Sequence, residues 1–154
     1  MRVLFVCLGN ICRSPTAEGV LRHKVSEAGL CARVEIASAG TGAWHVGKAP
    51  DVRTQAAAMR RGYDLSAQRA RQVSAEDFSR YDLVLAMDHS NLRDLKALQP
   101  AGSEADLDLF LRRYSSVCDD VPDPYYDGEQ GFEVVLDLIE RACDLLLIEL
   151  KGRL

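Results

Sequence analysis

The sequence predicts an α/β fold in a single three-layer domain, with a four-stranded parallel, twisted sheet flanked by helices. Two observations predict it. Short apolar segments alternate along the chain with segments whose apolar residues recur at helical spacing, an order typical of parallel sheets covered on both faces. The chain has 154 residues, of which 47% are hydrophobic, which is enough for one compact domain over residues 1–154 and too little for two.

The first half of the chain supplies two of the predicted strands. Residues 3–6 are an uninterrupted apolar run, typical of a strand buried on both faces. A helix is predicted from Pro15, which suits a first helical position, to Gly29. Residues 34–38 form the second predicted strand, and a loop rich in glycine and alanine follows over residues 40–50. Loops of this length often line functional sites.

The second half continues the alternation. It is predicted to contain a helix over residues 51–61, a strand over 82–87, a helix over 88–98 and a strand over 107–111. An aspartate begins each of these two helices, where its carboxylate is expected to cap the free N–H groups. A polar loop rich in aspartate then covers residues 115–131.

A long amphipathic helix closes the chain. Its apolar residues form a broad stripe at helical spacing, which we expect to pack on the sheet; a groove on a partner protein is the alternative. The stripe comprises Phe132, Val135, Leu136, Ile139, Cys143, Leu146, Leu147 and Leu150.

Composition and charge exclude several classes of protein. The net charge of −4 argues against nucleic acid as a partner, because phosphate backbones bind strongly basic faces. No segment approaches the roughly 20 apolar residues of a membrane span, so no membrane insertion is expected. An odd number of cysteines with no export signal argues against a disulfide scaffold and favours the cytoplasm. The cysteines are Cys7, Cys12, Cys31, Cys118 and Cys143.

The segment between the first strand and the first helix carries the chemistry. Cys7 directly follows the strand, and Arg13 closes the loop. Such a loop gathers backbone N–H groups and the positive end of a helix around one point, which suits a phosphate. The same setting stabilises the thiolate of Cys7, while the planar fork of Arg13 fits two phosphoryl oxygens. The expected phosphate-binding residues are Leu8, Gly9, Asn10, Ile11, Cys12, Arg13 and Ser14.

Three residues of this loop suit its expected shape. Gly9 lets the backbone turn its N–H inward, and Asn10 is one of the few residues besides glycine that tolerate a positive φ. The hydroxyl of Ser14 is close enough in sequence to donate to the Cys7 thiolate and to ease its later departure. The alternative for Ser14 is a plain helix cap.

A thiolate that attacks a phosphate ester needs a general acid for the leaving group, and Asp123 is the candidate. Pro124 keeps Asp123 extended, which projects its carboxyl away from the loop. Tyr125 and Tyr126 follow directly and are expected to form apolar walls of a narrow pocket.

Taken together, these segments resemble the low-molecular-weight protein tyrosine phosphatases of the bacterial type. The resemblance is carried by residues 6–15, by residues 123–125, and by residues 38–41 after the second strand. It extends over nearly the whole chain, in the family's order. A cysteine and an arginine six positions apart would be weak evidence alone, whereas the combination is specific.

The resemblance implies roles for individual residues. Cys7 is implied as the nucleophile, Arg13 as the phosphate clamp and Asp123 as the general acid and then base, with Ser14 as the partner of the thiolate. The expected activity is hydrolysis of phosphotyrosine through a phosphocysteine intermediate. The implied partners are phosphotyrosine proteins, among them a bacterial autophosphorylating tyrosine kinase.

The resemblance also assigns supporting residues. Asn10 and Ser38 resemble the pair that holds the strained loop. Trp44 and Tyr125 resemble the walls that grip an aromatic ring, with Tyr126 beside them, and such walls would select phosphotyrosine over phosphoserine.

Two further residues bear on regulation. Cys12 is expected to capture an oxidised Cys7 as a disulfide; a small buried residue beneath the loop is the equally weighted alternative. Many relatives carry a histidine where this chain has Gln68, so we expect a changed pH response more than a loss of activity.

Competing functions are less well supported by the sequence. The scattered histidines and the aspartate-rich loop fit no metal site, and no cofactor is required. Residues 42–49 only approach a nucleotide-binding motif. Arsenate reduction would need two more thiols close together. A phosphate carrier or a phosphotyrosine-binding module without turnover remains the alternative from another class. The presence of Asp123 argues against a carrier, and an intact Cys7 argues against a module that only binds.

Overall fold

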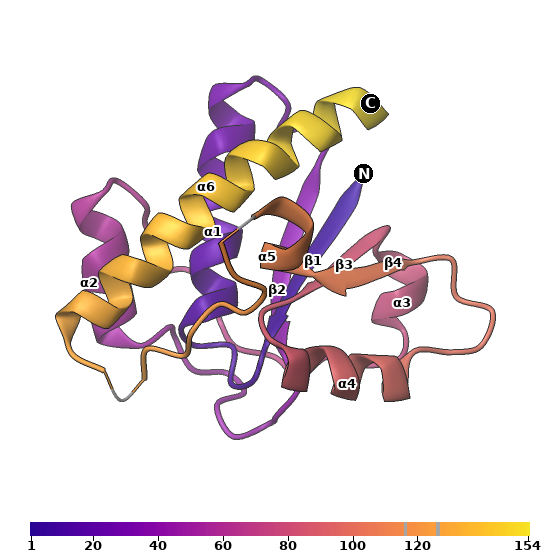
Figure 1. Cartoon of the computed structure of the whole chain (residues 1–154), viewed down its shortest axis with the longest axis horizontal. Coiled ribbons are helices and arrows are strands. Elements are labelled where there is room, and N and C mark those ends of the chain that lie inside the picture. The colour runs from indigo at the N-terminus through magenta and orange to yellow at the C-terminus, as the bar shows by residue number, and fades with distance from the viewer. Residues whose placement is uncertain (116, 126) are drawn as a thin grey trace.

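The computed structural model describes residues 1–115, 117–125 and 127–154, and it confirms the predicted fold class. Within these residues, four parallel strands form one sheet in the order β2-β1-β3-β4 (Figure 1). The strands are β1 (Arg2–Cys7), β2 (Glu35–Gly40), β3 (Leu83–Ala86) and β4 (Asp106–Leu109). The helices are α1 (Arg13–Glu27), α2 (Val52–Arg60), α3 (Asp77–Arg80), α4 (His89–Leu98), α5 (Phe110–Tyr114) and α6 (Glu129–Arg153).

Helices cover both faces of the sheet. Val3 and Phe5 of β1 pack in one cluster with the apolar residues of α1, α2, α5 and α6. Leu4 and Val6, which point to the opposite face, pack in a second cluster with those of α3 and α4. Because both faces of β1 are buried, its sequence is a continuous apolar run and does not alternate between apolar and polar residues.

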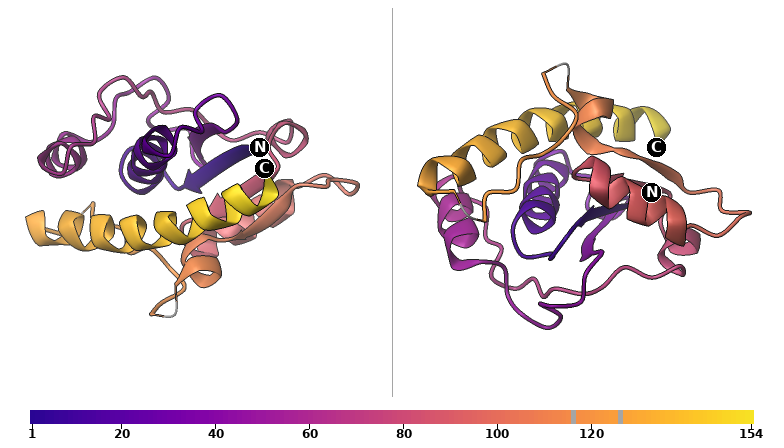
Figure 2. Two further views of the ribbon diagram at one scale, coloured as in Figure 1. Left: turned by 90° about the horizontal axis from the view of Figure 1, so that it is seen from above. Right: turned by 60° about the horizontal axis from the view of Figure 1, so that its bottom comes forward.

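The long C-terminal helix α6 packs against the rest of the fold through its apolar stripe. Figure 2 shows it running past α1 and reaching α2, in agreement with the contacts between these helices. The stripe is therefore core, as predicted. No helix in the described part of the chain is both long and apolar enough to cross a membrane.

The segment predicted as a strand over residues 107–111 is partly wrong. Strand β4 ends at Leu109, and the chain continues as the short helix α5. The ring of Phe110 packs edge-on against Phe5 of β1 and against Tyr114 one turn later, at centroid distances of 5.2 and 5.9 Å. A short apolar run fits strand and helix equally well, and this packing decides between them. Helix α3 was not predicted, because its 4 residues are too few to show a helical periodicity.

Parallel strands bring their carboxyl ends to one edge of the sheet, and this edge positions the candidate site. Cys7 at the end of β1 lies beside Gly40 at the end of β2. A side chain at residue 40 would place its Cβ 2.8 Å from the carbonyl oxygen of Leu8, so only glycine permits this approach. The loop after Cys7 thus rests directly on the end of the neighbouring strand.

Candidate active site

A cavity of about 220 Å³ opens at the carboxyl edge of the sheet. It contains the cysteine, the arginine and the aspartate that the sequence singled out. Its lining residues are Cys7, Leu8, Gly9, Ile11, Cys12, Arg13, Trp44, His45, Asp123 and Tyr125.

The loop from Cys7 to Arg13 wraps around the sulfur atom of Cys7. The Asn10 N–H donates to Cys7 Sγ at 3.3 Å, and the hydroxyl oxygen of Ser14 lies 2.9 Å from the same atom. Ser14 is the second residue of α1, past the N-cap position, which Cys12 occupies. Its hydroxyl contacts the sulfur, so Ser14 is not a plain helix cap. Both contacts lie at the start of α1, the end of a helix that favours negative charge.

Asn10 holds the loop in its strained shape. Its φ is +57°, in the left-handed region. The side-chain amide donates to Ser14 Oγ at 2.8 Å and to Ser38 Oγ at 2.9 Å, and its oxygen accepts from the Arg71 N–H at 3.0 Å. The structure thus brings Asn10, Ser14 and Ser38 together around Cys7.

The hydrogen-bond chain continues to a carboxylate that the sequence reasoning missed. Ser38 Oγ donates to Glu18 Oε1 at 2.8 Å, and Arg22 Nε donates to Glu18 Oε2 at 2.9 Å. Glu18 is buried, as are its neighbours in the first part of α1. Its spacing of four residues from Arg22 indicates a helical ion pair, but nothing in the sequence links it to Ser38.

Arg13 is buried and held from two sides. Its NH1 donates to Asp88 Oδ2 at 2.6 Å and to the carbonyl oxygen of Val121 at 3.1 Å. Burial alone would lower the pKa of Arg13, but the negative charge of Cys7 and the hydrogen bond to Asp88 outweigh it and raise that pKa above its ordinary value. The guanidinium is therefore permanently charged beside the sulfur.

Asp88 has a second role that the sequence did not indicate. As predicted, it caps helix α4, since its Oδ1 accepts from the Asn91 N–H at 2.8 Å. Its other oxygen binds Arg13, which comes from the start of α1. A cap signal is local, whereas the contact with Arg13 depends on the adjacency of β1 and β3.

Asp123 lies at the mouth of the cavity. Its Oδ2 is 3.7 Å from Arg13 NH2, and its Oδ1 accepts from the Tyr125 N–H at 3.1 Å. The side chain is 49% exposed, in contrast to the buried Arg13. A carboxyl placed this way reaches both solvent and the anion site, as a group that transfers protons to and from a substrate requires.

Aromatic side chains border the mouth. Trp44 is exposed and folds over Gly42, where its ring occupies the space that a Cβ would take. Tyr125 lies across the cavity under the guanidinium of Arg53, which is 5.3 Å from the ring centroid. Tyr126, the third residue expected in the pocket wall, lies outside the described residues.

His45 is a lining residue that the sequence did not single out. Its ring packs on Gly9, where a Cβ would approach its Cδ2 to 3.0 Å. The φ of Gly9 is not positive, so within this loop the left-handed backbone conformation occurs at Asn10 and not at Gly9. The absence of a side chain at Gly9 leaves space for the His45 ring.

Two residues expected to tune the site have defined surroundings. Burial raises the pKa of Cys12 to about 12, so Cys12 is a neutral thiol beside Cys7. The Gln68 amide donates to the carbonyl oxygen of Pro15 at 3.0 Å and so supports the first turn of α1.

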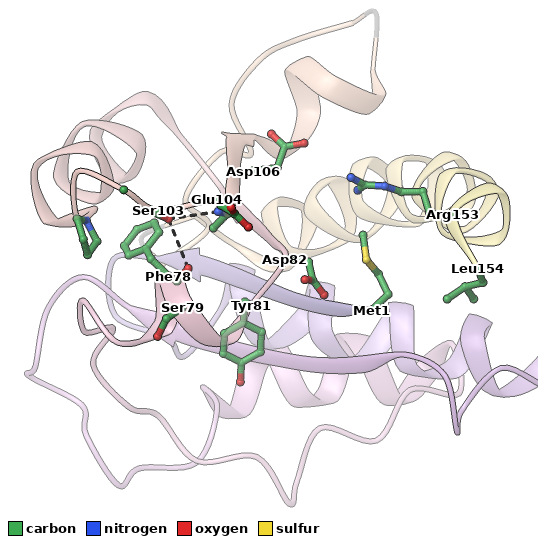
Figure 3. A pocket seen from close by; sticks show the side chains of 13 residues that line it. Met1, Phe78, Ser79, Tyr81, Asp82, Ser103, Glu104, Asp106, Arg153 and Leu154 are labelled. Atoms are coloured by element: carbon green, nitrogen blue, oxygen red, sulfur yellow. Dashed lines mark hydrogen bonds between the residues drawn. The ribbon is translucent and has the colours of Figure 1, made fainter.

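A larger cavity of about 760 Å³ lies at the opposite, amino-terminal edge of the sheet (Figure 3). Two of its carboxylates already have partners: Asp82 accepts from the Arg2 N–H, and Asp106 pairs with Arg113. No cysteine lines it. Among the described residues, no group of three or more histidine, cysteine, aspartate or glutamate side chains is placed to hold a metal ion. The smaller cavity is therefore the candidate active site.

Comparison with known proteins agrees with this geometry. The family described as low molecular weight phosphotyrosine protein phosphatase matches residues 2–153. A putative low molecular weight protein-tyrosine-phosphatase of Synechocystis is 46% identical, over 100% of this chain and 99% of that protein. A human low molecular weight phosphotyrosine protein phosphatase is 40% identical, over 94% and 92% of the two chains.

Solved structures show the same relationship. A protein tyrosine phosphatase from Entamoeba histolytica, with Hepes in its active site, superposes with a TM-score of 0.93 at 38% identity, covering 100% and 99% of the two chains. Vibrio vulnificus Wzb in complex with benzylphosphonate gives a TM-score of 0.82 at 28% identity over 96% and 97%. Fold, site geometry and sequence all place this chain in the low molecular weight phosphotyrosine protein phosphatase family.

Proposed function

We propose that this phosphatase hydrolyses phosphotyrosine in proteins, and small aryl phosphates, through a phosphocysteine intermediate with Cys7 as nucleophile. The observation that carries the proposal is the contact of two polar groups with the sulfur, the Asn10 N–H at 3.3 Å and the Ser14 hydroxyl at 2.9 Å, in a cavity that the charged Arg13 also lines. A thiolate held by such donors attacks phosphorus readily and is also a good leaving group.

In the first step, Cys7 Sγ forms a bond to phosphorus while the bond to the phenolic oxygen breaks. Asp123 gives its proton to that oxygen. Arg13 and the loop N–H groups bind the three remaining oxygens of the phosphoryl group, whose charge shifts during transfer. The 3.7 Å separation of Asp123 from Arg13 supports a carboxyl placed over the scissile bond.

In the second step, the Asp123 carboxylate takes a proton from a water molecule as the water oxygen attacks phosphorus. The sulfur–phosphorus bond breaks and Cys7 leaves as a thiolate. The Ser14 hydroxyl stabilises this thiolate by donating to it, which is consistent with the contact of 2.9 Å. Inorganic phosphate is the product.

The partners follow from the pocket. Trp44 and Tyr125 at its rim suit the faces of a phosphotyrosine ring, and a phosphoserine would reach less deeply between them. The binding of benzylphosphonate by Vibrio Wzb, a phosphonate on an aromatic group, supports the same ligand class here. Phosphotyrosine proteins, including a bacterial tyrosine autokinase, are the proposed substrates, in a reducing compartment such as the cytoplasm that keeps Cys7 reduced.

The test is metal-free phosphate release from matched phosphotyrosine and phosphoserine peptides. We expect turnover of the phosphotyrosine peptide, at least about tenfold higher in kcat/KM than that of the phosphoserine peptide. Asp123→Ala is expected to slow it by about 10²–10⁴-fold, the usual contribution of a general acid. Binding or stable phosphorylation without phosphate release would instead support the phosphate carrier or the non-hydrolysing binding module.

We propose that Cys12 protects the nucleophile from oxidation. Peroxide converts the Cys7 thiolate to a sulfenic acid, and the Cys12 thiol then condenses with it to a disulfide with loss of water. We expect Cys12→Ser to retain turnover within about threefold but to lose the recovery of activity by dithiothreitol after brief peroxide treatment. The wild type should recover under the same conditions. Equal recovery by both proteins would contradict this role.

A further inference from the structure

An ion-pair cluster outside the catalytic loop connects helix α4 to the segment that carries Asp123. His89 Nδ1 lies 2.7 Å from Asp120 Oδ1, and the backbone N–H of His89 donates to the same oxygen at 3.2 Å. His89 Nε2 is 3.9 Å from Asp119 Oδ2. His89 directly follows Asp88, the carboxylate that holds Arg13. The cluster therefore lies one residue from Asp88 at one end and three residues from Asp123 at the other.

The segment between the cluster and Asp123 is short and firmly tied. The Val121 N–H donates to the carbonyl oxygen of Met87 at 2.7 Å, and the carbonyl oxygen of Val121 accepts from Arg13 NH1 at 3.1 Å. The Val121 side chain is buried in the core. Asp123 is therefore two residues from this fixed point, and the contacts of His89 with Asp119 and Asp120 hold the chain on the other side of it.

We propose that His89 is a positioning residue, which holds Asp119 and Asp120 so that the Asp123 carboxyl stays over the leaving-group oxygen. This inference rests on the proposed function, in which Asp123 is the general acid. His89 does not line the cavity and acts only through the loop. Its side chain is 57% exposed, so the pair is partly screened by water, and a modest effect that weakens with salt is expected.

Charged groups from two elements surround His89. Facing it from the loop are Asp119 and Asp120; on its own helix, Asp88 precedes it, already bound to Arg13, and Arg93 follows one turn later. The two loop carboxylates lie on different ring nitrogens of the same imidazole, so removing that ring releases both of them at once.

The test compares two aryl phosphates that differ in their need for an acid. The phenolate that leaves phenyl phosphate is as basic as that of tyrosine and needs a proton, whereas 4-nitrophenolate leaves readily without one. For His89→Gln we expect kcat/KM with phenyl phosphate to fall three- to fivefold, and with 4-nitrophenyl phosphate to change by less than 1.5-fold. Asp120→Asn should do the same, and the double variant should be no worse than either single one.

Matched variants separate this role from a merely structural one. His23 pairs with Glu27 on the exposed side of α1, at 2.8 Å, so His23→Gln removes a similar ion pair far from the loop and should leave both substrates unaffected. His89→Arg keeps a permanent charge, so it should restore phenyl phosphate turnover.

The outcomes are distinguishable. Equal losses on both substrates, or no loss on phenyl phosphate, would overturn the positioning role of His89. Asp123→Asn is measured alongside, and its kcat/KM should fall far more with phenyl phosphate than with 4-nitrophenyl phosphate. If Asp123→Asn shows no such preference, the proposed general acid itself is wrong. If Asp123→Asn shows it and His89→Gln does not, only the inference about His89 fails.

Discussion

Replacing Cys7 with serine is expected to abolish phosphate release from phosphotyrosine peptides, with a loss of at least about 10⁴-fold in kcat. A serine hydroxyl is a much weaker nucleophile at neutral pH, because an alcohol is far less acidic than a thiol. Rapid acid quenching of the wild type should trap phosphate on the protein, and no such species should form with Cys7→Ser.

The anion site itself should survive this change, since the N–H groups of the loop and Arg13 remain. Cys7→Ser is therefore expected to bind phosphotyrosine peptides still, measured by calorimetry. Cys31→Ser is the matched control, because Cys31 is an exposed free cysteine, and its turnover should equal that of the wild type. Residual turnover of Cys7→Ser within tenfold of the wild type would rule out Cys7 as the nucleophile.

Arg13→Lys is expected to lower kcat by about 10²–10³-fold, a loss comparable to that of a fixed oxyanion donor. Lysine keeps the positive charge but not the fork that serves the phosphoryl oxygens, Asp88 and the carbonyl of Val121 together. Binding of inorganic phosphate should weaken as well. Stopped-flow measurement of phosphocysteine formation with 4-nitrophenyl phosphate locates the loss in the first step.

Two controls accompany this variant. Arg60→Lys, at an exposed arginine paired with Glu133, should leave kcat unchanged. Thermal unfolding should show that Arg13→Lys remains folded, with some loss of stability because the Asp88 carboxylate keeps a weaker partner. A folded Arg13→Lys protein with near-normal kcat would show that charge alone, and not the planar fork, serves the phosphoryl group.

Local signals were strong enough to predict most of the fold. The apolar run of β1 was predicted as a strand buried on both faces and the stripe of α6 as a helix face packed in the core, and the structure confirms both. The left-handed backbone at Asn10 was also predictable, because few residues tolerate it. In contrast, residues 107–111 suit a strand and a helix equally, and the packing of Phe110 on Phe5 selects the helix for its second part.

The candidate site likewise contains some residues that the sequence predicts and others that only the structure reveals. The sequence by itself determined Cys7, Arg13 and the loop between them, since a thiol, a helix start and a cation within seven residues form a local anion site. Only the tertiary structure decided the contacts of Asp88 with Arg13, of Glu18 with Ser38 and of His89 with Asp120. Their partners lie on other elements, and a side chain that caps a helix or faces water in sequence terms gains such a partner only when strands far apart in the chain become neighbours in the sheet.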